Sequence, residues 1–296
     1  MLRQFRRAVS RGLMRVRVGL FGNNHSFLIN SRYRRYHKAA MKCYRPQNPS
    51  LRSVEAAAEA FRRDGFVIVP PRLDEQAAIA LRDKVDELFS RDTDVLPIGG
   101  GLSRLIDGVD RVPEIIDLLH GQITAIIESY YRSHYKLYNV SFYRTVPYVG
   151  EQESSFLWHF DNSPDEEIKL MIYLDDVSEE TGAFRFKNIE TSERVRRMGF
   201  WHRTDYAVVQ TILDDPSTTM IAEGRPGTAI LFRQGRVVHK ATAPRRSHRD
   251  VVTMVVIPSV IPWRDHFARN RHLLSTNAGL CKNPWTDEPE NIGYRY

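Results

Sequence analysis

The second half of the chain is a succession of short apolar segments, and this pattern restricts the fold more than any other feature of the sequence. Eight candidate strands, four to ten residues long, follow one another with only one expected helix, at 193–202, inserted between them. They cover 136–145, 155–160, 168–177, 183–186, 218–222, 228–232, 237–240 and 251–258. Strands that do not alternate with helices favour a double-sheet jelly roll over a parallel α/β sheet.

Helical patterns precede this block of strands. Apolar residues recur at helical spacing over 54–63, 74–90 and 113–131, and a short apolar strand is expected at 65–70. The Gly-rich segment 96–109 is expected to be a loop. The sequence therefore predicts an α+β fold, in which a double-stranded β-helix (jelly-roll, cupin-like) core carries N-terminal helices packed on one sheet.

The length of 296 residues and a hydrophobic content of 42% suffice for one large packed domain, which we expect at 54–296. Residues 21–53 are expected to be an irregular linker with one short basic helix, so that 1–53 form an N-terminal arm. The two cysteines, Cys43 and Cys281, are too few for a disulfide framework or a zinc motif and fit a reducing compartment. No run approaches 18 apolar residues, so we expect a cytoplasmic protein.

The arm is strongly basic. Residues 1–54 hold 13 Lys and Arg and no Asp or Glu, whereas the rest of the chain carries 30 Lys and Arg against 36 Asp and Glu. Apolar residues within 1–20 form one helical stripe: Leu2, Phe5, Val9, Leu13, Val16 and Leu20. We favour peripheral association of this helix with an anionic membrane surface; an organellar transit peptide, and an arm that packs on the acidic body or on an oligomer partner, stay open. Nucleic acid is not an expected partner, because the positive charge does not continue into the body.

A metal-binding pattern lies in the strand block. His159 and Asp161 stand two residues apart, so on a strand their side chains point to the same side. His239, 80 positions later, supplies a second imidazole, and Arg249 follows it by ten residues. Two histidines and one carboxylate are the ligand set of non-haem Fe(II) oxygenases, which leaves open positions on the metal.

Two of these residues have rivals nearby. His248 also precedes an apolar strand, but it lies in a basic cluster that reads as a solvated turn, so we prefer His239. Arg245 and Arg246 belong to that same cluster, whereas Arg249 opens the strand at 251–258 and can point into a barrel.

With these elements in order, the chain resembles the phytanoyl-CoA dioxygenase family of Fe(II)- and 2-oxoglutarate-dependent oxygenases over residues 61–258. The segments that carry the resemblance are FRRDGFVIVP at 61–70, the helix at 81–88, His159-Phe160-Asp161, LMIYLDDV at 170–177, TGAF at 181–184, and GTAILF at 227–232 leading into His239. The resemblance implies that His159, Asp161 and His239 bind Fe(II). It also implies that Arg249 pairs with the distal carboxylate of 2-oxoglutarate, a role that suits the planar guanidinium.

Further residues follow from the resemblance or from strand position. Arg104 stands where some family members place a second basic contact to the co-substrate, and Met171 where some have an aromatic lining residue. Tyr143 and Asn139 share one face of the preceding strand and are candidates to line the pocket. The segment 186–192 replaces the family's usual Pro-Gly-Ser-His turn at the mouth of the site, so the family's substrates do not carry over.

The function expected from this resemblance is hydroxylation of an unactivated C–H bond with O2 and 2-oxoglutarate, releasing succinate and CO2, with ascorbate as an optional reductant. Related halogenases have a small residue in place of Asp161, which favours hydroxylation here. The expected substrate is a small molecule, a lipid or a lipid-linked compound. The alternative is a catalytically silent jelly-roll binding protein at a membrane surface. Oligomeric state does not follow from the sequence.

Overall fold

The structure is a computed structural model that describes residues 27–46, 51–71, 75–91, 95–106, 108–119, 121–151, 154–161, 163–200 and 207–271. The amphipathic helix predicted within residues 1–20 lies outside these ranges. In the part of the chain that is described, no helix combines the length and the apolar character needed to cross a bilayer.

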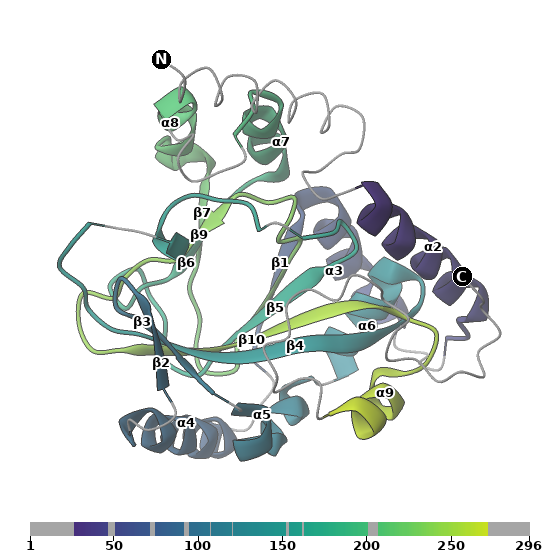
Figure 1. Cartoon of the computed structure of the whole chain (residues 1–296), viewed down its shortest axis with the longest axis horizontal. Helices are drawn as coiled ribbons and strands as arrows, with labels where there is room; N and C mark the ends of the chain where they lie inside the picture. Colours follow the sequence, from purple (N-terminus) through teal and green to yellow (C-terminus); the bar gives the residue numbers. More distant parts are fainter. Residues whose placement is uncertain are drawn as a thin grey trace.

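Two antiparallel sheets form the core of the molecule (Figure 1). The large sheet has the order β1-β8-β5-β10-β4-β3-β2, and the small sheet the order β7-β6-β9. The large sheet comprises β1 (Phe66–Val69), β8 (Ala229–Phe232), β5 (Ile168–Tyr173), β10 (Arg249–Ser259), β4 (His134–Thr145), β3 (Leu102–Leu105) and β2 (Val95–Gly99). The small sheet comprises β7 (Thr219–Ala222), β6 (Phe184–Lys187) and β9 (His239–Lys240).

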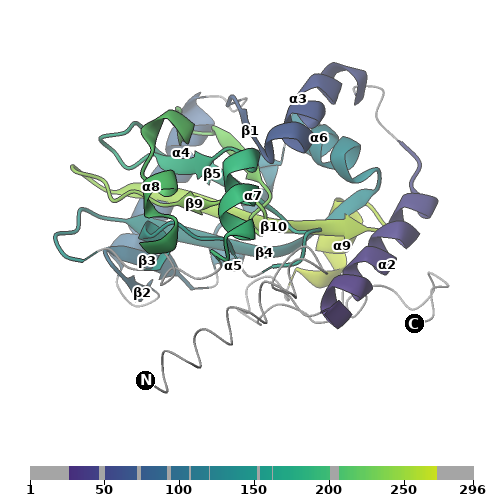
Figure 2. The same cartoon turned by 90° about the horizontal axis from the view of Figure 1, so that it is seen from above.

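Helices cover the outer faces of both sheets. The helices α7 (Ile189–Arg197) and α8 (Gln210–Leu213) lie beyond the small sheet (Figures 1 and 2). Five helices and one 3₁₀ turn contribute to the outer side of the large sheet: α3 (Leu51–Asp64), α4 (Glu75–Ser90), α5 (Gly108–Arg111), α6 (Gly121–Tyr131), α9 (Trp263–Asn270) and the turn Pro113–Leu118. The helix α2 (Phe27–Cys43) packs at one end, where Tyr36 and Ala40 contact Val260.

The alternation of side chains along β5 shows how one strand supplies two cores. Leu170 and Ile172 pack under the helices in the largest hydrophobic cluster, whereas Met171 and Tyr173 face the small sheet. Successive side chains of a strand point to opposite faces, so both faces of the large sheet are buried in its central strands. This arrangement confirms the predicted α+β jelly roll with N-terminal helices packed on one sheet.

The prediction of a loop at 96–109 was wrong. This segment forms the hairpin of β2 and β3, followed by α5, and is not a loop. The glycines at 99, 100 and 101 have φ values of 120°, 59° and 78°, which allow the tight turn. The hairpin is held because β3 pairs with β4, with Leu102 opposite Thr145, and local sequence patterns do not contain this long-range pairing.

Other boundaries also differ from the predictions. The helix predicted at 113–131 is divided into a 3₁₀ turn and α6. In the strand predicted at 155–160 only His159 pairs, in an isolated bridge to His239, while Ser154–Phe156 form a 3₁₀ turn. The predicted linker 21–53 contains the 17-residue helix α2, because Tyr33 and Tyr36 are buried against the body. The inserted helix begins earlier than predicted, at the N-cap Asn188.

Candidate metal centre

His159 and His239 are held side by side by backbone pairing. The His159 amide donates to the His239 carbonyl at 3.0 Å, and the His239 amide donates to the His159 carbonyl at 3.0 Å. β9 is in turn paired with β6, where Phe186 lies opposite His239. The two imidazole centroids are therefore only 4.3 Å apart, although 80 residues separate them in sequence.

The hydrogen bonds of the two rings determine which nitrogen faces the pocket. The Nδ1 atom of His159 lies 2.7 Å from the Leu157 carbonyl, and that of His239 lies 2.8 Å from the Val237 carbonyl. Because a carbonyl only accepts, each Nδ1 carries the proton and donates it. Each Nε2 is then unprotonated and presents its lone pair, which is the form of histidine that binds a metal.

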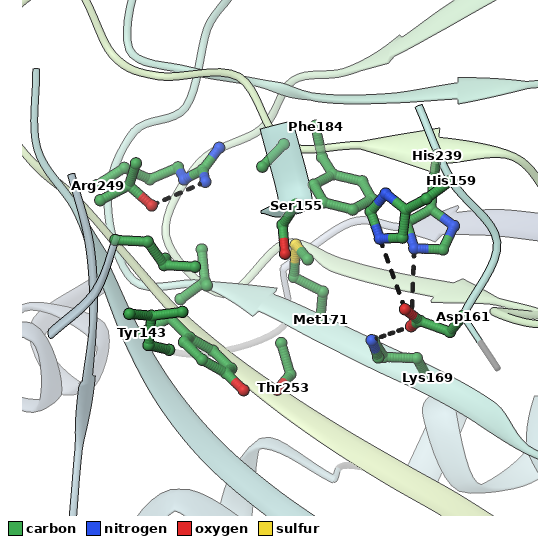
Figure 3. A pocket seen from close by; sticks show the side chains of 15 residues that line it. Tyr143, Ser155, His159, Asp161, Lys169, Met171, Phe184, His239, Arg249 and Thr253 are labelled. Atoms are coloured by element: carbon green, nitrogen blue, oxygen red, sulfur yellow. Dashed lines mark hydrogen bonds and ion pairs between the residues drawn. The ribbon is translucent and has the colours of Figure 1, made fainter. Parts of the chain in front are cut away.

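Asp161 completes the group (Figure 3). Its Oδ1 lies 3.5 Å from Nε2 of His159, and its Oδ2 lies 3.7 Å from Nε2 of His239. Adjacent ligands of a metal with bonds of about 2.1 Å lie roughly 3 Å apart, so small movements would bring these three atoms onto one ion. The Asp161 amide donates to the Gln234 carbonyl at 3.0 Å, which fixes the backbone beneath the carboxylate.

Lys169, which the sequence analysis did not single out, contacts the same carboxylate. It extends from β5, and its Nζ donates to Oδ2 of Asp161. Burial alone would raise the pKa of the Asp161 carboxyl, but Lys169 and the two histidine rings outweigh burial and hold this pKa well below its usual range. The signal in the sequence is a lysine within the otherwise apolar segment IKLMIY.

Arg249 lies across the pocket from this group (Figure 3). Its side chain is 2% exposed; Nη1 donates to the Gly182 carbonyl, and Nη2 donates to Oγ1 of Thr145 at 3.1 Å. Its Nε has no hydrogen-bond partner, and no carboxylate of the described residues lies within 4.0 Å of the guanidinium. Burial lowers the pKa of Arg249, and the more distant Tyr173, Asp175 and Asp250 offset only part of this effect.

One pocket of about 200 Å³ joins the two ends of the site. Tyr143 and Met171 line it, as predicted, whereas Arg104 and Asn139 are not among its lining residues. The lining residues are Ile98, Leu102, Tyr143, Thr145, Ser155, His159, Asp161, Lys169, Met171, Phe184, His239, Ala241, Arg249, Val251 and Thr253. Most are apolar or hydroxyl-bearing, and a volume of this size suits a small organic acid.

The rival residues lie elsewhere. His248 lies near Asp86 and Asp250, with its Nε2 3.7 Å from an oxygen of each. The guanidinium of Arg144 binds both carboxylates at 2.6 Å. The negative charge of Asp86 and Asp250 is therefore already balanced by an arginine. Arg245 pairs with Glu180 at the surface. Among the described residues, the group that faces the pocket is His159, Asp161 and His239.

The donor set fits Fe(II) by its chemistry. Two neutral imidazole nitrogens and one carboxylate oxygen converge from one side, and their free side opens on the pocket. This is the pattern of the facial triad in non-haem iron enzymes.

Solved structures share this architecture. The epimerase SnoN, in complex with Fe3+ and alpha-ketoglutarate, aligns with a TM-score of 0.52 and 17% identity over 70% of this chain and 84% of that chain. EctD from S. alaskensis, with bound Fe, aligns with a TM-score of 0.52 and 14% identity over 69% of this chain and 76% of that chain. HygX from Streptomyces hygroscopicus, with nickel and 2-oxoglutarate, aligns with a TM-score of 0.50 and 16% identity over 69% of this chain and 87% of that chain.

The chain has the fold that these three proteins share, and they were solved with bound iron or nickel and, in two cases, with 2-oxoglutarate. No protein-family model matches the sequence, and no curated protein matches it. The predicted likeness to Fe(II)- and 2-oxoglutarate-dependent oxygenases is thus confirmed at the level of the fold.

Proposed function

We propose that the protein is an Fe(II)- and 2-oxoglutarate-dependent oxygenase that hydroxylates a C–H bond of a small-molecule or lipid-linked substrate and releases succinate and CO2. The observation that carries this proposal is that one pocket holds both a His-Asp-His group and a buried guanidinium that contacts no carboxylate of the described residues. Fe(II) held by this group would supply the activation of O2. The fold supports the same class.

The protein side chains divide the work between the two ends of the pocket. His159 and His239 present their Nε2 atoms, and Asp161 contributes the negative charge that a divalent ion requires. Arg249 would bind the distal carboxylate of 2-oxoglutarate bidentately, which also removes the cost of its buried, unpaired charge. Met171 and Phe184 line the space between the two ends and limit the access of water.

Replacing Asp161 by Ala tests the metal group directly. D161A should lose both Fe(II)-dependent succinate release from 2-oxoglutarate and the binding of Mn(II), a non-turnover substitute, measured by electron paramagnetic resonance. D83A, which removes an exposed carboxylate paired with Arg82, is the matched control and should keep both. Full succinate release by D161A would contradict the assignment of the metal group.

Product analysis tests hydroxylation separately. Enzymes with this fold include an epimerase and a carbocyclase. A stimulating metabolite should yield a product 16 Da heavier, with one oxygen atom from O2 and one succinate per turnover. A product of unchanged mass, or one that lacks two hydrogens, would replace hydroxylation by another oxidative outcome.

We also propose that residues 1–20 attach the protein peripherally to anionic membranes. Because α2 packs on the body, the truncation that tests this must end before Phe27. Sedimentation with phosphatidylserine vesicles should carry down the full chain but not a chain lacking residues 1–26. Equal sedimentation of both would exclude the arm as the anchor. If the full chain binds vesicles but takes up neither metal nor 2-oxoglutarate, it is a binding protein without catalysis.

A further inference from the structure

Strands β3 and β4 of the large sheet form one wall of the pocket. Thr145 and Tyr143 of β4 line the pocket, and Arg104 of β3 lies directly opposite Tyr143 in the strand register. Leu102, two residues before Arg104, also lines the pocket, so Arg104 lies on the same face of the sheet. Its side chain is partly exposed on this face.

Arg104 has no partner within the described part of the chain. No acidic group of these residues lies within ion-pair distance, and none of their atoms accepts a hydrogen bond from its guanidinium. The hydroxyl of its neighbour Tyr143 likewise has no hydrogen-bond partner among the described residues, and its ring points into the pocket (Figure 3). The guanidinium of Arg104 and the hydroxyl of its cross-strand neighbour Tyr143 both supply hydrogen-bond donors to this face of the sheet.

The charge on this face is positive. The cations Arg249 and Lys169 and one carboxylate, Asp161, line the pocket, and Arg104 adds a third cation on the adjoining face of β3. Burial raises the pKa of the nearby Glu167 carboxyl to about 8, so this carboxyl is mostly protonated at neutral pH. An Fe(II) ion and a 2-oxoglutarate dianion cancel each other, so two positive charges would remain when both are bound.

The register also gives the span of the site. Arg104 lies three strands from Lys169 across β4 and β10, and their partners on β10, Val251 and Val255, are four residues apart. With strands about 4.8 Å apart and about 3.4 Å per residue, the two Cα atoms are roughly 20 Å apart. A substrate that contacts Arg104 while its reacting carbon lies near Asp161 must therefore extend along this face, as a larger metabolite or one end of a larger molecule does.

We propose that the substrate of the oxygenase carries an anionic oxygen group, a carboxylate or a phosphate, that Arg104 binds with the help of the Tyr143 hydroxyl. This inference rests on the proposed function, because it places the substrate beside a metal and co-substrate in the same pocket. Arg104 would then contact the substrate rather than the co-substrate that the sequence suggested, which agrees with its position beyond the pocket lining.

Matched probes test the anion requirement. The full chain loaded with Mn(II) and 2-oxoglutarate is titrated by calorimetry with phenyl phosphate, with benzoate, and with the neutral analogue benzyl alcohol. At least one anionic probe should bind at least about tenfold more tightly than the alcohol, and added salt should weaken the binding of that anionic probe. The comparison of phenyl phosphate with benzoate distinguishes the two anionic groups. Equal affinity for anionic and neutral probes would overturn the proposal.

Substitution locates the binding residue. R104M should weaken the preferred anionic probe about 10- to 100-fold, the range expected for loss of hydrogen bonds to a charged group, while R104K should recover part of it. R91M, which removes an exposed arginine paired with Glu87, is the control and should bind the probe as the natural protein does. Unchanged probe affinity in R104M would refute the assignment.

The affinity for 2-oxoglutarate separates this inference from the proposed function. If the Mn(II)-loaded natural protein binds no 2-oxoglutarate, the proposed function fails. If R104M loses 2-oxoglutarate binding as R249M does but keeps the anionic probe, Arg104 serves the co-substrate and only the present inference fails. Retained 2-oxoglutarate affinity with a weakened probe supports it.

Discussion

Replacing Arg249 by Met should separate ligand affinity from stability. The guanidinium is buried and hydrogen-bonded to Gly182 and Thr145, but no carboxylate of the described residues lies within 4.0 Å. If 2-oxoglutarate supplies that carboxylate, R249M removes one partner of a buried, hydrogen-bonded ion pair. Such truncations cost about 2–5 kcal/mol of binding energy, so the Kd for 2-oxoglutarate should rise roughly 30- to 4,000-fold.

Stability should respond differently. R249M loses hydrogen bonds to neutral oxygens, each contributing about 1 kcal/mol, but it also removes a buried charge whose desolvation costs several kcal/mol. The free energy of unfolding of the metal-free protein should therefore fall by no more than about 1 kcal/mol.

Two measurements check this reasoning. Calorimetric titration of the Mn(II)-loaded protein gives the 2-oxoglutarate affinity, and urea unfolding of the metal-free protein gives the stability. R249K, which keeps the charge without the planar fork, should lie between the natural protein and R249M in affinity. An R249M protein that binds 2-oxoglutarate within about threefold of the natural protein would refute the assignment. Loss of more than about 3 kcal/mol of stability would show that Arg249 is structural.

Three further predictions follow from the surroundings of the pocket. Burial raises the pKa of Glu167 to about 8 from an ordinary value near 4.5, so the folded state binds this proton more tightly than the unfolded state does. The resulting contribution to the free energy of unfolding is fully present below about pH 4.5 and is lost as the pH rises to about 8. The melting temperature of E167Q should therefore exceed that of the natural protein at pH 8.5 but not at pH 4.5, and a constant difference would contradict the shift. G182A should destabilise the protein by about 1–3 kcal/mol and weaken 2-oxoglutarate binding, because Gly182 has a φ of +89° and its Cβ would lie 2.6 Å from the Thr242 carbonyl; the control G121A, with open space around the added Cβ, should not do so in urea unfolding. Addition of EDTA to Fe(II)-loaded protein should lower its melting temperature under anaerobic conditions, whereas EDTA should leave D161A unchanged in differential scanning fluorimetry.

The candidate metal group could be predicted because it depends on residue types and their local spacing. The histidine and aspartate at 159 and 161 need only an extended backbone to point the same way. A later histidine ahead of a strand completed the set, and the structure brings all three together. The strand segments followed equally well from apolar runs bounded by breakers, since burial between two sheets demands such runs.

Long-range pairing decided what the sequence did not show. The hairpin of β2 and β3 forms because its glycines allow the turn and β4 offers a free edge, and only this pairing places Arg104 on the pocket face. The contact between Lys169 and Asp161 likewise depends on how β5 passes beneath the metal group.

The sequence by itself therefore determined the candidate ligand types, most of the strands and the candidate co-substrate arginine. The tertiary structure decided which charges share one pocket and which lack a partner. The physical reason is range: side-chain periodicity is set by neighbours a few residues away, whereas the electrostatic environment of Arg249 and Arg104 depends on strands that are distant in sequence.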